Sequence, residues 1–509
     1  MKLPMLTGIA GMTVALAACS SATQEKKPNI IFILGDDLGY ADIGCYGQKI
    51  IETPNIDALT KTGIRFTNYY SGSPVSAPSR CTILTGKHSG HSFIRGNHEW
   101  PERGDVWNFV KMEEDPSLEG QYPIPAETVT FSKILQQQGY KTGCIGKWGL
   151  GAPYTDGVPN KQGFDFFFGY NCQRQAHTYY PQHLWRNEKI VKLNNSFTIP
   201  RTTELDGDKD PYKPESYARY NLTDYSPALM LKEALGFLDS AKGNPFFLYV
   251  TTTIPHVPMQ APQDLVAKYH EKIGEEKPYL GEKGYFPCRY PMATYAAMVS
   301  YLDSEVGALV QKLKELGEYE NTIIIFSSDN GPVITGGADG SFFHNAEPFN
   351  MDGKRLKGTV YEGGIHVPLI ISWPSKITEP GESDLICAGY DMFPTFCDLS
   401  GAAKPDSLDG ISIVPTILGK GKQTKHEYLY WEFPEGRGQQ AVRLGDWKGI
   451  RDSTKAGNMN IQLFNLAGDA KELSDVAAQH PDVVGRIEKI MEESHKKPEI
   501  DRFNIFKNN

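Results

Sequence analysis

The sequence predicts an α/β fold with a mostly parallel central sheet and helices on both faces, followed by a small C-terminal antiparallel sheet with a terminal helix. Apolar runs of strand length alternate with helical stretches along most of the 509 residues. The runs NIIFIL (29–34), PFFLYVTTT (245–253) and NTIIIFSS (321–328) are almost unbroken, which is typical of strands covered on both faces. Near the C-terminus the pattern changes to shorter, alternating strands.

Helical patterns separate these apolar runs. A short helix is expected to begin near Pro54, a second spans 128–139, and a third spans 226–241 with Ser226 as its N-cap. A further strand, YKTGCIG (140–146), follows the second helix. The repeated order of strand, helix and strand indicates a sheet whose strands are mostly parallel.

The chain changes character after Lys422. The segments HEYLYWEF (426–433), QAVRLGDWKGIR (440–451) and IQLFNLAG (461–468) read as short strands, and apolar residues at helical spacing follow near 483–490. We therefore expect a main domain at residues 28–422 and a C-terminal subdomain at 423–509. This subdomain is expected to pack against the edge of the main sheet and to close one side of a cleft.

The N-terminus has the pattern of an export signal. Lys2 precedes an apolar stretch that ends at Leu16-Ala17-Ala18-Cys19, which resembles a bacterial lipoprotein box. We expect residues 1–18 to be a lipoprotein signal peptide, Cys19 to be lipidated and residues 19–27 to be a polar tether. The alternative is a plain secretory signal with a chance cysteine. The first interpretation predicts an exported lipoprotein in the periplasm or outer membrane of a Gram-negative bacterium, held to the membrane by its lipid anchor only.

Composition narrows the classes of partner. The net charge of −9 argues against a nucleic-acid partner, which needs a basic face. It does not exclude an anionic small substrate, because a few local cations can outweigh the global charge inside a cleft. The seven cysteines after Cys19 contain no pair at CxxC spacing, and we expect most of them to be small buried residues.

Polar residues that could take part in catalysis or metal binding follow four of the predicted strands. Asp36-Asp37, Lys147, His256 and Asp329-Asn330 each come directly after a strand or a few residues beyond it. Because ligand sites in an open parallel sheet form beyond the carboxyl ends of the strands, we expect these residues to meet at one edge.

The acidic part of this set suits a metal ion. Three carboxylates and an amide oxygen form an all-oxygen donor set for a hard cation such as Ca²⁺ or Mg²⁺. Taken alone, Asp36-Asp37 could be a solvated turn or helix cap, and Asp-Asn-Gly at 329–331 a hairpin turn. Three like charges at one edge would repel each other without a cation, so the metal interpretation is favoured.

The basic part of the set suits an anionic ester. Arg80, Lys147, His256 and Lys357 would place fixed positive donors around one point. A cation together with such donors is the arrangement for transfer of a phosphoryl or sulfuryl group, whose oxygens carry the charge. The alternatives are surface lysines for Lys147 and Lys357, and a rigid loop residue for His256 between two prolines.

The stretch Ser76-Ala77-Pro78-Ser79-Arg80, followed by LTG, resembles the signature of type I sulfatases in the alkaline phosphatase superfamily. Further segments similar to that family keep its order, among them DDLGYADIGCYG, TPNIDAL, GKWGLG, PHVP, SSDNG and KGTVYEGG. The resemblance implies an alkaline phosphatase-like catalytic sulfatase domain and oxidation of Ser76 to formylglycine. The serine form is similar to the bacterial type that a radical maturase converts under anaerobic conditions.

The resemblance also implies a role for each site residue. Ca²⁺, in preference to Mg²⁺, would be held by Asp36, Asp37, residue 76, Asp329 and Asn330. Arg80 would steady the formylglycine hydrate, Lys147 and Lys357 would hold sulfate oxygens, His256 with Lys357 would assist the leaving alcohol, and Asp329 would be the base for the attacking hydroxyl.

One position departs from the family pattern. Gly149 stands where many members carry a histidine that takes the second proton of the hydrate. His88, His91 or His177 could substitute for it, or water or the metal could suffice. The departure concerns the second half of the reaction and not the first.

The substrate is expected to be a glycan. The segment 168–187 is rich in aromatic, His and Arg residues that could stack on sugar rings and bond hydroxyls, or could pack on its own domain. Arg95, Arg174 and His177 are the candidate substrate residues. The resemblance implies an exo-acting carbohydrate sulfatase that acts on galactose or N-acetylgalactosamine in mucin, glycosaminoglycan or algal polymers. The alternatives are a phosphoesterase of the same superfamily, or a non-catalytic glycan-binding lipoprotein if Ser76 is not matured.

Overall fold

The computed structural model of the protein describes residues 26–200, 204–333, 335–337 and 339–506. The predicted signal peptide, the predicted lipidation at Cys19 and most of the predicted tether lie outside the described residues.

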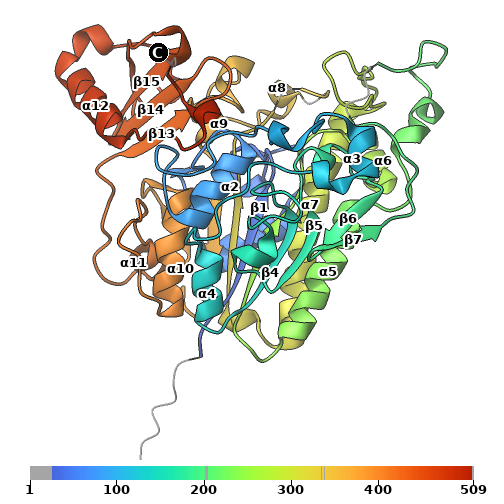
Figure 1. Ribbon diagram of the computed structural model, residues 1–509, viewed down its shortest axis with the longest axis horizontal. Coiled ribbons are helices and arrows are strands. Elements are labelled where there is room, and N and C mark those ends of the chain that lie inside the picture. The colour runs from blue at the N-terminus through green and yellow to red at the C-terminus, as the bar shows by residue number, and fades with distance from the viewer. Residues whose placement is uncertain (1–25, 201–203, 334, 338, 507–509) are drawn as a thin grey trace, which may run out of the picture.

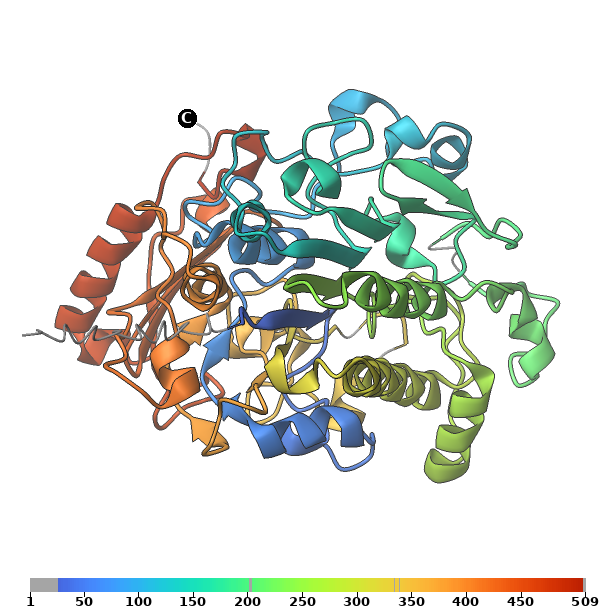
Figure 2. The ribbon, with the colours of Figure 1, turned by 90° about the horizontal axis from the view of Figure 1, so that it is seen from below.

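A ten-stranded sheet forms the centre of the molecule (Figures 1 and 2). Its order is β11-β2-β10-β9-β1-β8-β4-β5-β6-β7. The central strands are β9 (Thr322–Ser328), β1 (Asn29–Gly35), β8 (Phe246–Thr251), β4 (Lys141–Lys147) and β5 (Phe166–Tyr170), and all neighbours among them are parallel. The flanking strands are β11 (Gly381–Ser383), β2 (Gly63–Phe66), β10 (Leu369–Ser372), β6 (His183–Arg186) and β7 (Lys189–Lys192), with antiparallel pairs at β2-β10, β10-β9, β5-β6 and β6-β7. The mostly parallel sheet is confirmed.

Helices cover both faces of this sheet, as predicted. Strand β1 shows why: Ile31 and Ile33 point into one core cluster, whereas Ile30, Phe32 and Leu34 point into the other. The first cluster packs against α1 (Pro54–Leu59), α5 (Ser226–Ala241) and α7 (Pro291–Leu316). The second packs against α2 (Ser76–Thr85), α4 (Phe131–Gln137) and α10 (Met392–Ser400), and Figure 1 shows α4 and α10 side by side. Each fully buried side chain of this size stabilises the fold by about 1.5–3 kcal/mol.

One helix start differs from the sequence prediction. Helix α5 begins at Ser226 itself, and its N-cap is Tyr225. The hydroxyl of Ser226 does not cap the helix but accepts a hydrogen bond of 2.7 Å from the hydroxyl of Tyr170 on β5. Ser226 therefore ties the helix to the sheet rather than satisfying its free N–H groups.

A four-stranded antiparallel sheet follows at the C-terminus, as predicted, with β13 (Leu429–Phe433), β14 (Gln439–Leu444), β15 (Trp447–Asp452) and β16 (Gln462–Asn465) in sequence order. The terminal helix α12 (Pro481–Ser494) covers its outer face. Its inner face, with Trp431, packs on Tyr70 and Ile365 of the main domain. The predicted boundary at residues 422–423 falls in the segment that precedes β13. This unit is the red part of Figure 1.

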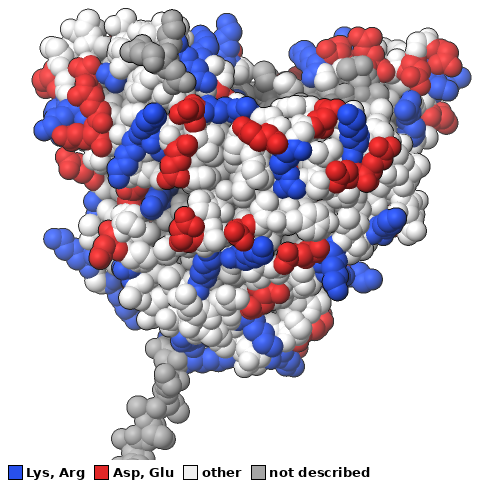
Figure 3. Space-filling view, in the orientation of Figure 1, with Lys and Arg blue, Asp and Glu red and all other residues white. Residues whose placement is uncertain are grey.

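The α-helices and strands of the described chain that remain lie outside the two larger sheets and their main covering helices. They are α3 (Phe109–Glu114), α6 (Gln263–Ile273), α8 (Gly340–Phe343), α9 (Glu362–Ile365), α11 (Val414–Leu418) and the two-stranded pair β3 (Tyr69–Tyr70) and β12 (Cys387–Ala388). The seven cysteines from Cys45 onward are free thiols, and all but Cys45 are buried. Within the described ranges, no helix combines the length and the apolar character that a membrane crossing requires. Acidic and basic side chains are interspersed over the face seen in Figure 3, in keeping with the modest net negative charge.

Candidate active site

The polar residues that follow the central strands meet at one edge of the sheet. Strands β9, β1, β8 and β4 are neighbours and parallel, so their carboxyl ends lie side by side. Backbone hydrogen bonds fasten the segments that follow them, because the N–H of Asp36 donates to Ile254 (3.0 Å) and that of Asp329 donates to Gly35 (3.0 Å). The nine predicted catalytic and metal-binding residues that the structure brings together are Asp36, Asp37, Ser76, Arg80, Lys147, His256, Asp329, Asn330 and Lys357.

Ser76 is the first residue of helix α2 and is fully buried. Its Oγ donates to Oδ1 of Asp36 at 2.9 Å and lies 3.4 Å from Oδ1 of Asn330. The helix starts here because Val75 is extended and the side chain of Asn97 accepts a hydrogen bond from the N–H of Ala77 at 2.8 Å. Position 76 is thus held against the acidic strand ends by local helix geometry.

Three buried carboxylates lie beside this hydroxyl, and each pairs with one cation. Asp36 contacts Nζ of Lys147 at 2.5 Å, Asp37 contacts Nζ of Lys357 at 2.7 Å, and Asp329 contacts Arg80 at 3.1 Å. The amide of Asn330 donates to Asp37 at 2.8 Å. Such buried charges are stable only when paired.

These pairings set the protonation of the carboxyls. Burial opposes ionisation of Asp36, but Lys147, His256 and Arg80 outweigh it and hold its pKa below the usual range. Burial, and then the charge of Asp36, raise the pKa of Asp329 to about 7. One carboxyl is therefore a firm anion, and another can exchange a proton near neutral pH.

The donor set fits a hard divalent cation. Asp36, Asp37 and His256 bring ligand atoms within 4.8 Å of one another, and Asp329 and the amide oxygen of Asn330 add further oxygens. Buried carboxylate and amide oxygens are the ligands that Ca²⁺ and Mg²⁺ prefer.

His256 also lies beside Asp37. Its Nε2 is 3.6 Å from Oδ2 of Asp37, and its Nδ1 lies 2.5 Å from the carbonyl of Val257. Since a carbonyl can only accept, Nδ1 carries the proton and Nε2 is the acceptor in the neutral ring. Burial, and then the charge of Lys357, lower the pKa of His256 to about 4. The ring stacks on His177, with centroids 5.2 Å apart and an angle of 8° between the planes.

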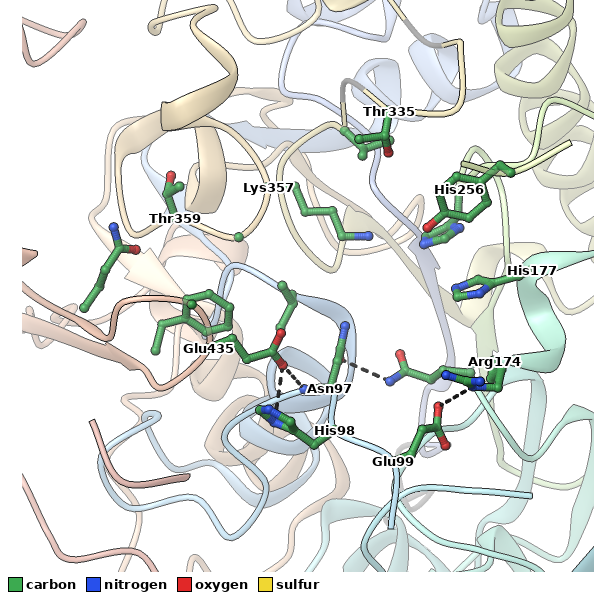
Figure 4. A pocket seen from close by; sticks show the side chains of 18 of the residues that line it. Asn97, His98, Glu99, Arg174, His177, His256, Thr335, Lys357, Thr359 and Glu435 are labelled. Carbon is green, nitrogen blue, oxygen red and sulfur yellow. Dashed lines mark hydrogen bonds and ion pairs between the residues drawn. The ribbon is translucent and has the colours of Figure 1, made fainter. Parts of the chain in front are cut away.

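A pocket of about 610 Å³ opens above these residues (Figure 4). Lys147, His256 and Lys357 line it together with loop residues of the main domain such as Asn97, Glu99 and His177. The C-terminal subdomain supplies Phe433, Glu435, Gly436, Arg437, Gln439 and Asp452 to the same pocket. The subdomain thus forms one wall, as the sequence predicted.

A sulfatase family model matches residues 28–402, and a model described as N-sulphoglucosamine sulphohydrolase, C-terminal, matches residues 352–497. The chain belongs to the sulfatase family. The predicted membership of the sulfatase family, the predicted class of enzyme and the predicted alkaline phosphatase-like fold are confirmed, and the protein is an enzyme that hydrolyses sulfate esters.

Curated relatives and solved structures agree with this assignment. An N-acetylgalactosamine-6-O-sulfatase of Bacteroides thetaiotaomicron is 30% identical, with 96% of this chain and 98% of the relative covered. Human arylsulfatase A is also 30% identical, with 86% and 77% covered. Among solved structures, Ps i-CgsB in complex with k-i-k-neocarrahexaose is 29% identical with a TM-score of 0.72, covering 93% of this chain and 94% of that one.

The three predicted substrate residues of this sulfatase have different fates. His177 and Arg174 line the pocket. Arg95 does not: its buried guanidinium forms an ion pair with Glu432 of the C-terminal subdomain and donates to the carbonyl of Lys496 at 2.7 Å. The structure therefore contradicts the prediction that Arg95 contacts substrate and places it in the interface between the two units.

The three histidines proposed to replace the one missing at Gly149 also lie in different places. His88 and His91 pack together and pair with Asp409, and neither is among the described residues that line the pocket. His177 remains beside the predicted catalytic residues through its stacking on His256.

Gln173 fills the space beside Gly149. The glycine has a φ of +75°, and a Cβ added to it would lie 2.6 Å from Cγ of Gln173. The amide of Gln173 accepts a hydrogen bond of 2.8 Å from Arg80 and donates one of 3.1 Å to Asn97. Gln173 therefore positions Arg80, a role that no motif in the sequence indicated.

The segment 168–187 proved to have both of the roles that its composition allowed. Gln173, Arg174 and His177 face the pocket, whereas Tyr170 and Tyr179 are fully buried in the core. Other pocket residues, such as Glu435 and Asp452, had no sequence signal because they reach the pocket only through packing of the C-terminal sheet.

Proposed function

We propose that this sulfatase is an exo-acting carbohydrate sulfatase that removes O-sulfate from galactose or N-acetylgalactosamine residues of glycans, after oxidation of Ser76 to formylglycine. The observation that supports this most directly is the position of Ser76. Its hydroxyl lies 2.9 Å from Asp36, in a buried cluster that also holds three cations. A bacterial radical maturase is the proposed source of the modification.

Ca²⁺, in preference to Mg²⁺, is the proposed metal, with Asp36, Asp37, residue 76, Asp329 and Asn330 as its ligands. The formylglycine hydrate at position 76 would supply the hydroxyl that attacks sulfur. The divalent cation, when bound, would hold the oxygens around that sulfur. The ammonium groups of Lys147 and Lys357 would then be available to sulfate oxygens, because the cation would take over the carboxylates that they now contact.

The proton transfers can be assigned to residues of this chain. Asp329 is the proposed acceptor for the attacking hydroxyl, because its buried carboxylate belongs to the same cluster as residue 76 and is held there by Arg80 and the N–H of Asp37. Lys357, together with His256, is proposed to assist the leaving alcohol, because both side chains line the pocket and lie beside Asp37. His256 offers Nε2 as an acceptor, and Arg80 steadies residue 76.

The shape of the pocket and the relatives support the choice of substrate. The sulfate-binding cations lie at the buried end of a pocket walled by both units, which suits a terminal sugar carrying one sulfate. The Bacteroides relative is named for action on N-acetylgalactosamine 6-O-sulfate and matches over 96% of this chain. An exported lipoprotein of the periplasm or outer membrane would meet such glycans from outside the cell.

The proposal is tested by mass spectrometry of position 76 together with activity assays on a panel of sulfated sugars. Protein co-expressed with a radical maturase should show loss of two hydrogens at Ser76 in the tryptic peptide that ends at Arg80. Desulfation of monosulfated galactose or N-acetylgalactosamine should appear only with that loss, and Ser76→Ala should abolish it. Equal turnover of phosphate esters by unconverted protein would contradict the proposal and favour a phosphoesterase.

A further inference from the structure

We propose that the exposed indole of Trp107 is a stacking platform for the sugar next to the sulfated one, so that the enzyme binds at least two sugars of its glycan. This inference rests on the proposed function as a carbohydrate sulfatase. Trp107 lines the pocket and is 58% exposed, whereas Trp148, Trp185 and Trp431 are buried in the core. A large aromatic surface left open at a pocket rim is suited to a ligand with an apolar face.

The ring of Trp107 is held in place from one side. The guanidinium of Arg174 lies 3.4 Å from the ring centroid and 5.0 Å from that of Phe109. Arg174 also donates to the backbone carbonyl of Trp107 at 3.0 Å. Cation–π contact and this hydrogen bond fix both the side chain and the backbone of Trp107. The indole is therefore preorganised, which lowers the entropic cost of binding a ligand on its open side.

Arg174 is itself buried and anchored. It is 5% exposed, and its Nε lies 3.5 Å from Glu99. Figure 4 shows Arg174 and Glu99 together at one side of the pocket, away from Lys357. In this proposal, Arg174 acts as a positioning residue that supports the aromatic surface facing the glycan.

The platform is also connected to the catalytic centre. Arg174 follows Gln173 in the chain, and the amide of Gln173 accepts a hydrogen bond of 2.8 Å from Arg80. Two consecutive residues thus link the group that steadies position 76 to the group that carries the indole. This link gives the platform a fixed position relative to the sulfate-binding end of the pocket.

The difference in burial assigns the platform to the second sugar. Lys147, which is expected to hold sulfate, is 2% exposed at the inner end, and Trp107 is 58% exposed. A sugar whose sulfate reaches Lys147 occupies the inner part of the pocket. The indole at the rim then faces the next sugar, whose C–H groups supply the apolar face and whose hydroxyls remain in water.

The experiment compares two substrates that share the same sulfated sugar. Kinetics of wild type, Trp107→Ala and Trp107→Phe are measured on the free monosulfated monosaccharide and on the same sugar at the non-reducing end of an oligosaccharide. For the oligosaccharide, Trp107→Ala should raise KM about 3- to 10-fold, and Trp107→Phe should restore most of the loss. For the monosaccharide, both variants should stay within about twofold of wild type, as should the exposed control Tyr154→Ala, which is 64% exposed and is not among the residues that line the pocket, on both substrates.

A binding measurement separates this proposal from the proposed function. Calorimetric titration of the sulfated oligosaccharide into Ser76→Ala protein, with and without Trp107→Ala, needs no turnover. Affinity that depends on Trp107 in an enzyme that desulfates no glycan would overturn the proposed reaction and support the platform. An equal loss on both substrates, or no loss on either, in an active enzyme would overturn the platform.

Discussion

Replacing Gly149 with alanine tests the packing around Arg80. The change adds one carbon at a φ of +75°, at a point 2.6 Å from Cγ of Gln173. Gln173 cannot move away freely, because its amide accepts from Arg80 at 2.8 Å and donates to Asn97 at 3.1 Å. The substitution therefore strains the backbone and also disturbs the group that positions Arg80.

The magnitude follows from two separable costs. A residue with a Cβ in the left-handed region costs about 1–2 kcal/mol. Overpacking against a fixed side chain adds about 1–3 kcal/mol. The free energy of unfolding should therefore fall by about 2–5 kcal/mol in Gly149→Ala. A matched control is Gly139→Ala, since Gly139 has a φ of +83° but nothing within 4 Å of an added Cβ. This control should lose only the backbone cost of about 1–2 kcal/mol.

The assay is urea unfolding followed by circular dichroism, within a double-mutant cycle. Gln173→Ala removes the overlap, so the double variant should be more stable than the sum of the two single effects predicts by about 1–3 kcal/mol. If Gly149→Ala costs no more than Gly139→Ala, or if the two single effects add within about 0.5 kcal/mol, Gln173 does not fill the space beside Gly149.

Three further predictions concern the metal, the interface and pH. Chelation with EGTA should abolish activity and lower the melting temperature, and Ca²⁺ should restore both more fully than Mg²⁺; an unchanged melting temperature would contradict a structural metal site. Arg95→Ala should lower the free energy of unfolding by about 1.5–3 kcal/mol, because Glu432 loses one buried charged partner and keeps its contacts with Tyr430 and His495. KM should be unchanged in steady-state assays, and a raised KM at normal stability would return Arg95 to the substrate site. Burial opposes the charge of His183, but Glu113 and Glu119 outweigh it and raise its pKa to about 10. Because this folded-state pKa exceeds the unfolded value of about 6.5, the stabilisation is fully present below about pH 6.5 and is lost as the pH rises through about 10. The difference in unfolding free energy between wild type and His183→Asn should shrink over that range, and a constant difference would refute the ion pair.

The central sheet could be predicted because its strands are long and buried on both faces. Runs such as 29–34 and 322–328 need no partner to be recognised, and parallel order then places Asp36 and Asp329 at one edge. The short strands that flank the parallel centre of the sheet were missed, since strands of three or four residues such as β11 and β10 carry little periodicity. The start of α5 was missed by one residue, because Ser226 bonds to Tyr170 and this long-range contact overrides local capping preference.

The inner site could be predicted from the sequence, but most residues of the outer pocket could not, for a physical reason. Ser76, Lys147 and the acidic residues lie at the ends of regular elements, whose direction fixes where the side chains go. Gln173 and Trp107 lie on irregular segments. The conformation of such segments depends on contacts with residues far away in the sequence, here Arg80 and Arg174. Arg95 shows why sequence position alone was not enough. An arginine near the signature helix can form an ion pair in a domain interface as readily as it can contact a substrate.

The C-terminal subdomain is held to the main domain by buried charges as well as by apolar packing, and this has a consequence for the pocket. Lys448 on β15 is fully buried and contacts Glu362 at 2.7 Å and Glu472 at 3.0 Å. Buried ion pairs add little net stability over apolar contacts, but a displaced sheet would leave these charges unpaired at a cost of about 3–5 kcal/mol. The charges therefore select one register of the sheet on the main domain. Because β14 and the turn before it carry Glu435 and Gln439 into the pocket, that register also determines the shape of the wall that meets the substrate.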